Sequence, residues 1–161
     1  MKYALAFSLC VLAIGTAYAD EAAQCQANRG TYLTGAVIRA PKFVRGHPQK
    51  GVELSHTHLL LKSDQDGRTY DVAIDNVFAE GYDAARRAVP DPLSSIQVGD
   101  RLGLCGKPFS GGHLGIDWVH TNCGNTSTPS KPDGWLKVLN PDGTGGRNLE
   151  GSQEYCRIFG R

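Results

Sequence analysis

Two segments near the middle of the chain alternate apolar and polar residues on either side of a tight turn, and this pattern limits the fold more than any other feature. The first segment covers residues 52–62, and the second covers residues 69–75. A period of two indicates strands that bury one face and expose the other. Asp66-Gly67, which lies between the two segments, is typical of a hairpin turn. The sequence therefore predicts an antiparallel hairpin in a mainly β protein.

Other segments extend this predicted sheet. Residues 31–40 are rich in β-branched and apolar residues and end before Pro41. Strands are also expected over residues 101–106, 115–122 and 135–140. Residues 78–89 place apolar side chains at helical spacing before Pro90, which predicts a short helix. Three strands, a helix and two more strands are the order of a small five-stranded Greek-key barrel of the OB type, here with a C-terminal extension. A β-sandwich is the main alternative.

The first 19 residues have the three parts of a secretory signal peptide. Lys2 supplies the positive charge, an uncharged apolar stretch follows, and Ala17-Tyr18-Ala19 matches the small-x-small cleavage pattern. We expect cleavage before Asp20, which leaves residues 20–161 as a single domain. The apolar stretch is shorter than the roughly 20 residues that span a bilayer. The sequence therefore predicts a periplasmic or secreted protein without a membrane anchor.

Four cysteines remain after this cleavage, and an even number in an exported chain predicts two disulfides. They are Cys25, Cys105, Cys123 and Cys156. Four cysteines allow three connectivities. We favour Cys25–Cys156, which would tie the two ends of the chain together, with Cys105–Cys123 as the second bridge.

The cleaved chain carries no net charge, but cations gather in one segment. Without Lys2 the chain has 16 basic and 16 acidic residues, which argues against a dedicated nucleic-acid binder. Residues 39–50 nevertheless contain four cations and no acid. In an OB barrel this segment connects the first two strands and often contacts ligand. Arginine suits phosphate or carboxylate groups, and an aromatic ring suits a sugar or base.

We therefore predict that this connector binds an anionic polymer or an exported partner protein. The predicted ligand-binding residues are Arg39, Lys42, Phe43, Arg45, His47 and Lys50. An ordinary solvated loop is the alternative interpretation.

Histidines on the expected strands favour two other functions. A secreted, nuclease-like hydrolase would use His58 and His120 for general acid–base chemistry with Asp117 or Asp75, and Arg45 as an anion clamp. The chain has no serine-nucleophile motif and no paired-carboxylate signature to accompany them. The simpler interpretation is a structural histidine at the end of the barrel.

The third function is metal binding. His56 and His58 share one strand face, and His120-x-x-Cys123 has a spacing that can chelate a metal. An oxidising compartment would place Cys123 in a disulfide, which leaves only His56, His58 and His120 as weak candidate ligands. The residues therefore predict no cofactor.

Three short motifs occur in the C-terminal half of the chain. They are Gly111-Gly112, Trp118-Val119-His120-Thr121 and Asp133-Gly134-Trp135. With these motifs, and with His56 or His58 upstream, residues 31–138 resemble a family of short exported bacterial proteins that has no established activity. The four cysteines and a longer loop before Asp133 depart from the family pattern. The resemblance implies a small exported β-barrel and implies no reaction.

Overall fold

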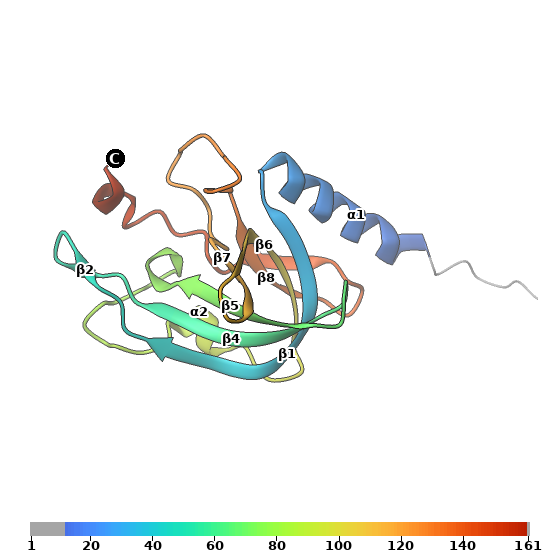
Figure 1. The fold of residues 1–161 in the computed structure, drawn as a ribbon, viewed down its shortest axis with the longest axis horizontal. Helices are drawn as coiled ribbons and strands as arrows, with labels where there is room; N and C mark the ends of the chain where they lie inside the picture. The colour runs from blue at the N-terminus through green and yellow to red at the C-terminus, as the bar shows by residue number, and fades with distance from the viewer. Residues whose placement is uncertain (1–11, 161) are drawn as a thin grey trace, which may run out of the picture.

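Five strands close into a barrel in the computed structural model, which describes residues 12–160. They are β1 (Thr31–Val44), β4 (His56–Ser63), β5 (Thr69–Asp75), β6 (Arg101–Ser110) and β7 (Leu114–Asp117). Their order around the barrel is β1-β4-β5-β7-β6, and β6 pairs back onto β1 (Figure 1). Only β5 and β7 run parallel among the barrel strands described. This is the OB arrangement, so the predicted fold class is confirmed and the β-sandwich is excluded.

The predicted hairpin lies at the centre of this barrel. On β4, Thr57, Leu59 and Leu61 are buried, whereas His56 and His58 alternate with them on the outer face. The inward side chains of all five strands pack into one apolar core. Gly35 lets β1 bend from β4 onto β6, because a Cβ there would lie 2.2 Å from the Lys62 carbonyl oxygen.

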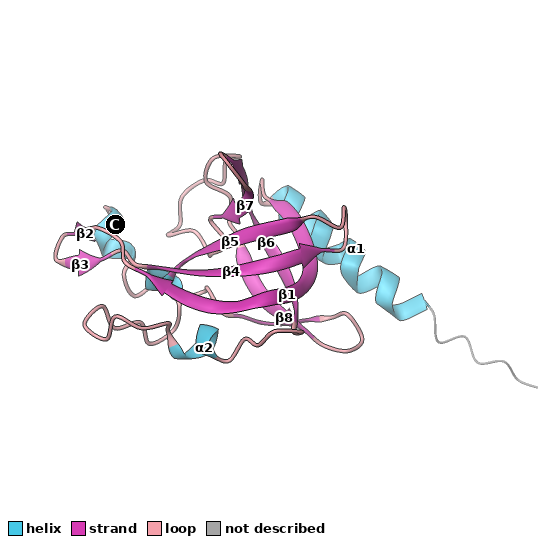
Figure 2. Ribbon diagram, turned by 60° about the horizontal axis from the view of Figure 1, so that its bottom comes forward, coloured by secondary structure: helices cyan, strands magenta, loops and turns pink. Residues whose placement is uncertain are grey.

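Smaller elements surround the barrel. β8 (Trp135–Leu139) and β9 (Gly145–Asn148) extend the sheet from β6, and β2 (Pro48–Gln49) pairs with β3 (Val52–Glu53) in the connector between β1 and β4. The helical elements are α1 (Leu12–Ala27), η1 (Asn76–Phe78), α2 (Asp91–Ser94) and η2 (Cys156–Phe159). Figure 2 shows the β2–β3 hairpin and the C-terminal end together, at the end of the barrel opposite α1.

The predicted helix over residues 78–89 is wrong. These residues form turns after η1, and the short helix of the fold is α2, where Pro92 lies in the first turn. Gly81 and Arg87 both adopt left-handed backbone angles, with φ of 70° and 47°, which interrupt a right-handed helix. The helical spacing of the apolar residues has a different cause. Phe78 and Tyr82 bury their rings in a second apolar cluster, which lies against the connector between β1 and β4.

Two strand boundaries also differ from the prediction. β1 passes Pro41 and continues to Val44, because the proline lies at an irregular register between Arg39 and Lys42 where no ladder hydrogen bond is lost. β7 ends at Asp117 instead of residue 122, because Trp118 adopts a left-handed φ of 57° and turns the chain away from the sheet.

The predicted disulfide pairing is wrong, although the presence of two bridges is confirmed. The bridges are Cys25–Cys105 and Cys123–Cys156. α1 packs beside β1 and β6, which brings Cys25 to Cys105 on β6. η2 packs beside Cys123 in the second apolar cluster, which brings Cys156 to that residue. Gly30 accommodates the first bridge, since a Cβ there would lie 2.5 Å from the sulfur of Cys105.

The N-terminal helix crosses the predicted signal-peptide cleavage site. α1 begins at Leu12, and residues 1–11 of the predicted signal peptide lie outside the described residues. Glu21 anchors the later part of α1, because its carboxylate accepts hydrogen bonds from Lys137 at 2.8 Å and from Tyr32 at 3.3 Å. Within residues 12–160, none of the helices has the length and apolar character that a membrane crossing requires.

Candidate ligand-binding face

His56 and His58 lie on the outer face of β4, and each shares an aspartate of β5 with a histidine from outside these two strands. Antiparallel register places His56 directly opposite Asp75, while His58 lies one pleat further along β4. The His56 and His58 rings are 6.4 Å apart between centroids. In OB barrels this face and the loops beside it contact ligand. The two histidine pairs therefore occupy the position where a barrel of this type binds.

The first group consists of His56, Asp75 and His120. The Nε2 atom of His56 lies 2.8 Å from one Asp75 carboxylate oxygen, and Nε2 of His120 lies 3.4 Å from the other. His120 is buried, and its Nδ1 lies 3.0 Å from the Thr121 carbonyl oxygen. Both nitrogens of His120 are thus engaged, whereas Nδ1 of His56 has no partner among the described residues.

The electrostatics of this group follow from its hydrogen bonds. Burial opposes the charged form of Asp75, but hydrogen bonds from His120 and His56 outweigh it and hold the pKa of Asp75 below its usual value. The same hydrogen bond, which His56 donates to Asp75, raises the pKa of His56 against the opposing effect of burial. Asp75 therefore remains an ionised anchor, and its contact favours the imidazolium form of His56.

A pocket of about 410 Å³ opens over this group. The ring of Phe78 stacks on His120 with 3.7 Å between centroids, and Phe159 stacks on Phe78 at 5.6 Å. The ring centroids of Trp118 and His120 are 5.1 Å apart, and the indole N–H of Trp118 donates to Asn122 at 3.3 Å. Strained backbone at a bulky residue is uncommon, and here the left-handed turn at Trp118 brings both Trp118 and His120 to the pocket wall.

The Asp133-Gly134-Trp135 motif holds this wall in place. The Asp133 carboxylate accepts the Asn122 backbone N–H at 2.8 Å, and the Gly134 N–H donates to the His120 carbonyl at 2.9 Å. Gly134 has no room for a side chain, because a Cβ would lie 2.5 Å from the Trp118 carbonyl oxygen. Trp135 is buried against the Cys25–Cys105 bridge, as expected of a residue that pins the C-terminal segment. The motif thus fixes the positions of Trp118 and His120 in the pocket wall.

The second group consists of His58, Asp71 and His113. Nδ1 of His58 lies 2.9 Å from one oxygen of Asp71, and Nε2 of His113 lies 3.3 Å from the other. A groove of about 570 Å³ runs past this group and is also lined by Arg39 and Lys42 of β1. Lys42 is the register partner of His58, so the two side chains share the outer face. The second group therefore lies in a cationic groove.

The residues of the predicted cationic connector are divided between these two regions. Arg39 and Lys42 belong to β1 and line the groove, while His47 lines the pocket. Arg45 pairs with Glu53 at 3.4 Å. Phe43 lies opposite Thr57 and is half-buried, and Lys50 occupies the turn between β2 and β3. The connector is not a single binding loop, because half of it is strand.

The structure brings together only part of the candidate hydrolase set. His58 bonds to Asp71 and His120 to Asp75, while Arg45 is held by Glu53. Asp117 follows Ile116 on β7; burial raises the pKa of its carboxyl, and its Oδ1 is buried without a hydrogen-bond partner.

The three candidate metal ligands are likewise divided between the two groups. No cluster of three or more His, Cys, Asp or Glu side chains with metal-binding geometry occurs in residues 12–160. The thiol of Cys123 is consumed by its disulfide.

Sequence reasoning missed Phe78, Phe159, Asn122 and Lys131 as pocket residues, and His113 and Asp71 as groove residues. Asp71 had a usable signal, because it lies on the outer face of β5 with the same parity as Asp75. The others come from loops and from the short 3-10 helices η1 and η2, where tertiary packing decides which side chains reach the pocket.

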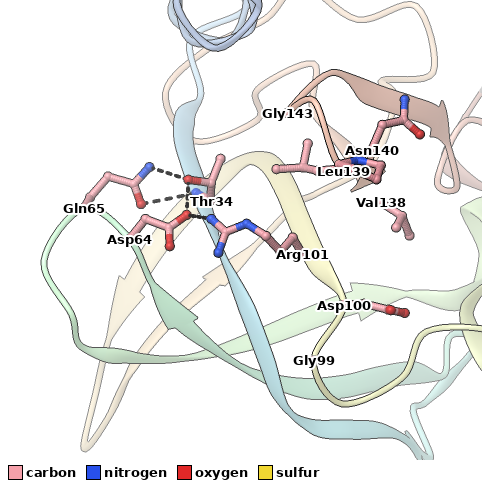
Figure 3. Close-up of a pocket in the computed structure, with 11 residues that line it drawn as sticks. Thr34, Asp64, Gln65, Gly99, Asp100, Arg101, Val138, Leu139, Asn140 and Gly143 are labelled. Atoms are coloured by element: carbon pink, nitrogen blue, oxygen red, sulfur yellow. Dashed lines mark hydrogen bonds and ion pairs between the residues drawn. The ribbon is translucent and has the colours of Figure 1, made fainter. Parts of the chain in front are cut away.

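A third cavity, of about 540 Å³, lies between the β4–β5 loop and β8 (Figure 3). Figure 3 shows the side chains of Thr34, Asp64, Gln65 and Arg101 turned toward one another, whereas Asp100 and Asn140 point elsewhere. Thr34 donates its hydroxyl to Asp64 at 2.8 Å and accepts from Gln65 at 3.1 Å, and Arg101 pairs with Asp64. Because these groups satisfy each other, this cavity offers a ligand less than the β4–β5 face does.

The chain matches no protein-family model and no curated protein. The geometry of the β4–β5 face is therefore the basis for assigning a function.

Proposed function

We propose that this protein is an exported binding domain whose ligand is an anionic polymer lying across the outer face of β1, β4 and β5. The observation that carries the proposal is the groove in which Arg39 and Lys42 lie beside His58 and His113. Two fixed cations and two imidazoles there face a single carboxylate, that of Asp71. Such a groove attracts repeated phosphate or carboxylate groups.

The pairing of the other cations supports the choice of this groove. Neither Arg39 nor Lys42 forms an ion pair within residues 12–160. By contrast, the side chains of Arg45, Arg68, Arg86, Arg87, Arg101, Lys137 and Arg147 are each paired with an acid. Other cations of the described chain, Lys131 among them, also lack an ion pair, but Arg39 and Lys42 lie together on the face where OB barrels bind.

The disulfides support export, because such bridges persist in oxidising compartments. We place the protein in the periplasm or outside the cell, where anionic chains such as acidic glycans and released nucleic acid are available. The proposed binding site therefore differs from the one predicted from the sequence. It contains the first part of residues 39–50 together with β4 and β5, instead of the whole connector.

Replacing Arg39 and Lys42 with glutamine should abolish most of the binding at low salt. We expect wild-type protein to bind polygalacturonate or a single-stranded 12-mer oligonucleotide, measured by fluorescence anisotropy over a salt series. Loss of two contacts to the phosphates of the oligonucleotide should lower the slope of log affinity against log salt by about 1.4 for the single strand. The two probes separate carboxylate from phosphate ligands.

The matched control removes two charges elsewhere. Arg86 and Arg147 are exposed and paired with the exposed acids Asp91 and Glu80, so their double glutamine variant has the same net charge as the test variant. The control should keep the wild-type affinity and salt slope. Equal behaviour of the two double variants, or no binding of either probe by the wild type at 20 mM salt, would contradict the proposed function.

A further inference from the structure

We propose that the pocket over His56 and Asp75 binds one ring-bearing anionic unit, with its ring against the aromatic wall and its carboxylate or phosphate on His56 and Lys131. This inference rests on the proposed function for the anionic character of the ligand. It adds a second, deeper site that takes a single sugar acid or nucleotide.

The size and walls of the pocket suit a single ring. Its volume of about 410 Å³ lies within the usual range for small-ligand sites. Three aromatic side chains line it, those of Phe78, Trp118 and Phe159. The face of Phe78 is already occupied by His120, so Trp118 and the 41% exposed Phe159 are the rings available for stacking.

Two donor groups in the pocket remain available for an anionic oxygen. Asp75 has both carboxylate oxygens covered by histidines, and Asn122 is engaged with Trp118, with Lys131 and through its own backbone. Nδ1 of His56 and the ammonium of Lys131 have no partner in the described part of the chain. A ligand with an anionic oxygen satisfies both groups at once.

Two carboxylates favour a protonated His56. Asp75 on β5 bonds to its Nε2, and Asp117 at the end of β7 adds a longer-range attraction, both of which raise the pKa of His56. His120 lies on the other side of Asp75, and His58 is the neighbour along β4. His47 and Lys131 complete the surroundings of the pocket. An anion bound at Nδ1 would further stabilise the imidazolium, so binding should take up a proton as pH rises toward neutrality.

A covalent tether holds the aromatic wall. The Cys123–Cys156 bridge attaches η2 to the loop after β7, and the Ile158 carbonyl accepts the side-chain N–H of Gln49 at 2.9 Å. These contacts hold Phe159 over Phe78 at the pocket mouth. The pocket also continues the cationic groove, because His56 and His58 are neighbours on one face. One unit of a polymer that crosses the groove can therefore enter the pocket.

The test measures binding of single units by NMR titration at millimolar concentration. The probes are glucuronate and uridine 5′-monophosphate, with glucose and uridine as uncharged counterparts. We expect one or both anions to shift the resonances of residues 118–122 and the uncharged counterparts to bind at least tenfold more weakly. Affinity of the wild type for the bound anion should fall between pH 5.5 and pH 8, as His56 loses its proton.

His56→Gln is the test variant, since glutamine keeps a donor near the Nε2 position for Asp75 and removes Nδ1. It should lose affinity by roughly tenfold or more, the scale of a hydrogen bond to a charged group, and lose the pH dependence. Arg86→Gln is the matched control, because it removes one exposed positive charge outside both the pocket and the groove, and it should bind within twofold of wild type. Phe159→Ala, at an exposed position, should also weaken binding without unfolding the protein.

The outcomes separate this inference from the proposed function. Single-unit binding that survives in the Arg39→Gln/Lys42→Gln variant supports the pocket even if polymers bind nowhere. Polymer binding in the groove without detectable single-unit binding overturns the pocket inference and leaves the proposed function standing. Equal affinity for charged and uncharged probes, or equal loss in His56→Gln and Arg86→Gln, also overturns it.

Discussion

Replacing Glu150 with methionine should stabilise the protein by about 1–3 kcal/mol at pH 7, the usual cost of a buried polar group without partners. Glu150 is fully buried, and neither of its carboxylate oxygens has a hydrogen-bond partner within the described chain. Burial raises the pKa of Glu150 well above its usual value, and the nearby charge of Asp75 adds to the effect. Methionine has a similar shape and no polar group to desolvate.

The sign of the pH dependence follows from this raised pKa. In the unfolded chain Glu150 ionises near 4.5, whereas in the folded protein it remains protonated to higher pH. Its contribution to stability is therefore complete below pH 4.5 and is lost as pH rises toward the folded-state pKa. The gain in Glu150→Met should grow between pH 4.5 and pH 7, as measured by urea unfolding at several pH values.

Glu154→Met is the control for this measurement, because Glu154 is exposed and the change in charge is identical. It should alter stability by no more than about 0.5 kcal/mol. A methionine variant that is less stable than wild type at pH 7, or a gain that does not change with pH, would show that the carboxyl of Glu150 makes a stabilising contact.

Removing the Cys25–Cys105 bridge should cost about 4.5 kcal/mol of unfolding free energy, the largest loss that we expect from a single contact. The bridge joins residues 80 positions apart, so its reduction releases a long loop in the unfolded chain. Both cysteines are buried beside Trp135. The double alanine variant, which avoids burying new polar groups, should be measured by chemical unfolding in the absence of reductant.

The second bridge provides a comparison of a different kind. Cys123–Cys156 joins residues 33 positions apart, and its double alanine variant should lose about 3.7 kcal/mol. That variant should also lose affinity for the single-unit probes, since it frees η2 and Phe159, whereas the Cys25–Cys105 variant should retain it while folded. Equal effects of both variants on ligand affinity would contradict the assigned role of η2.

The barrel was predictable because its strands have strong local patterns. Alternation along β4 and β5 is enforced by burial of one face, so Leu59, Leu61 and Val72 could be assigned to strands before their partners were known. The prediction of a helix over residues 78–89 failed because the same apolar spacing also suits side chains that reach a tertiary cluster from consecutive turns. Disulfide pairing failed because it depends on which elements are neighbours in space.

The candidate site was only partly predictable. His56 and His58 were recognised as residues of one strand face, but their partners depend on hairpin register. A two-residue turn at Asp66-Gly67 would have placed His58 opposite Asp75, whereas the observed four-residue loop places His56 there. The left-handed turn at Trp118 had no signal, because bulky residues seldom adopt that conformation.

The parallel pairing of β5 with β7 has a consequence for the ligand. In the described barrel it joins only Asp71 to Gly115 and Val72 to Ile116, which makes it the shortest junction of the cylinder. Native-state opening begins where few backbone bonds must break, so hydrogen exchange should be fastest along this line. His58 and His113 meet at Asp71 on either side of it. A ligand in the groove that contacts both His58 and His113 would link the two sides of the junction and slow its opening.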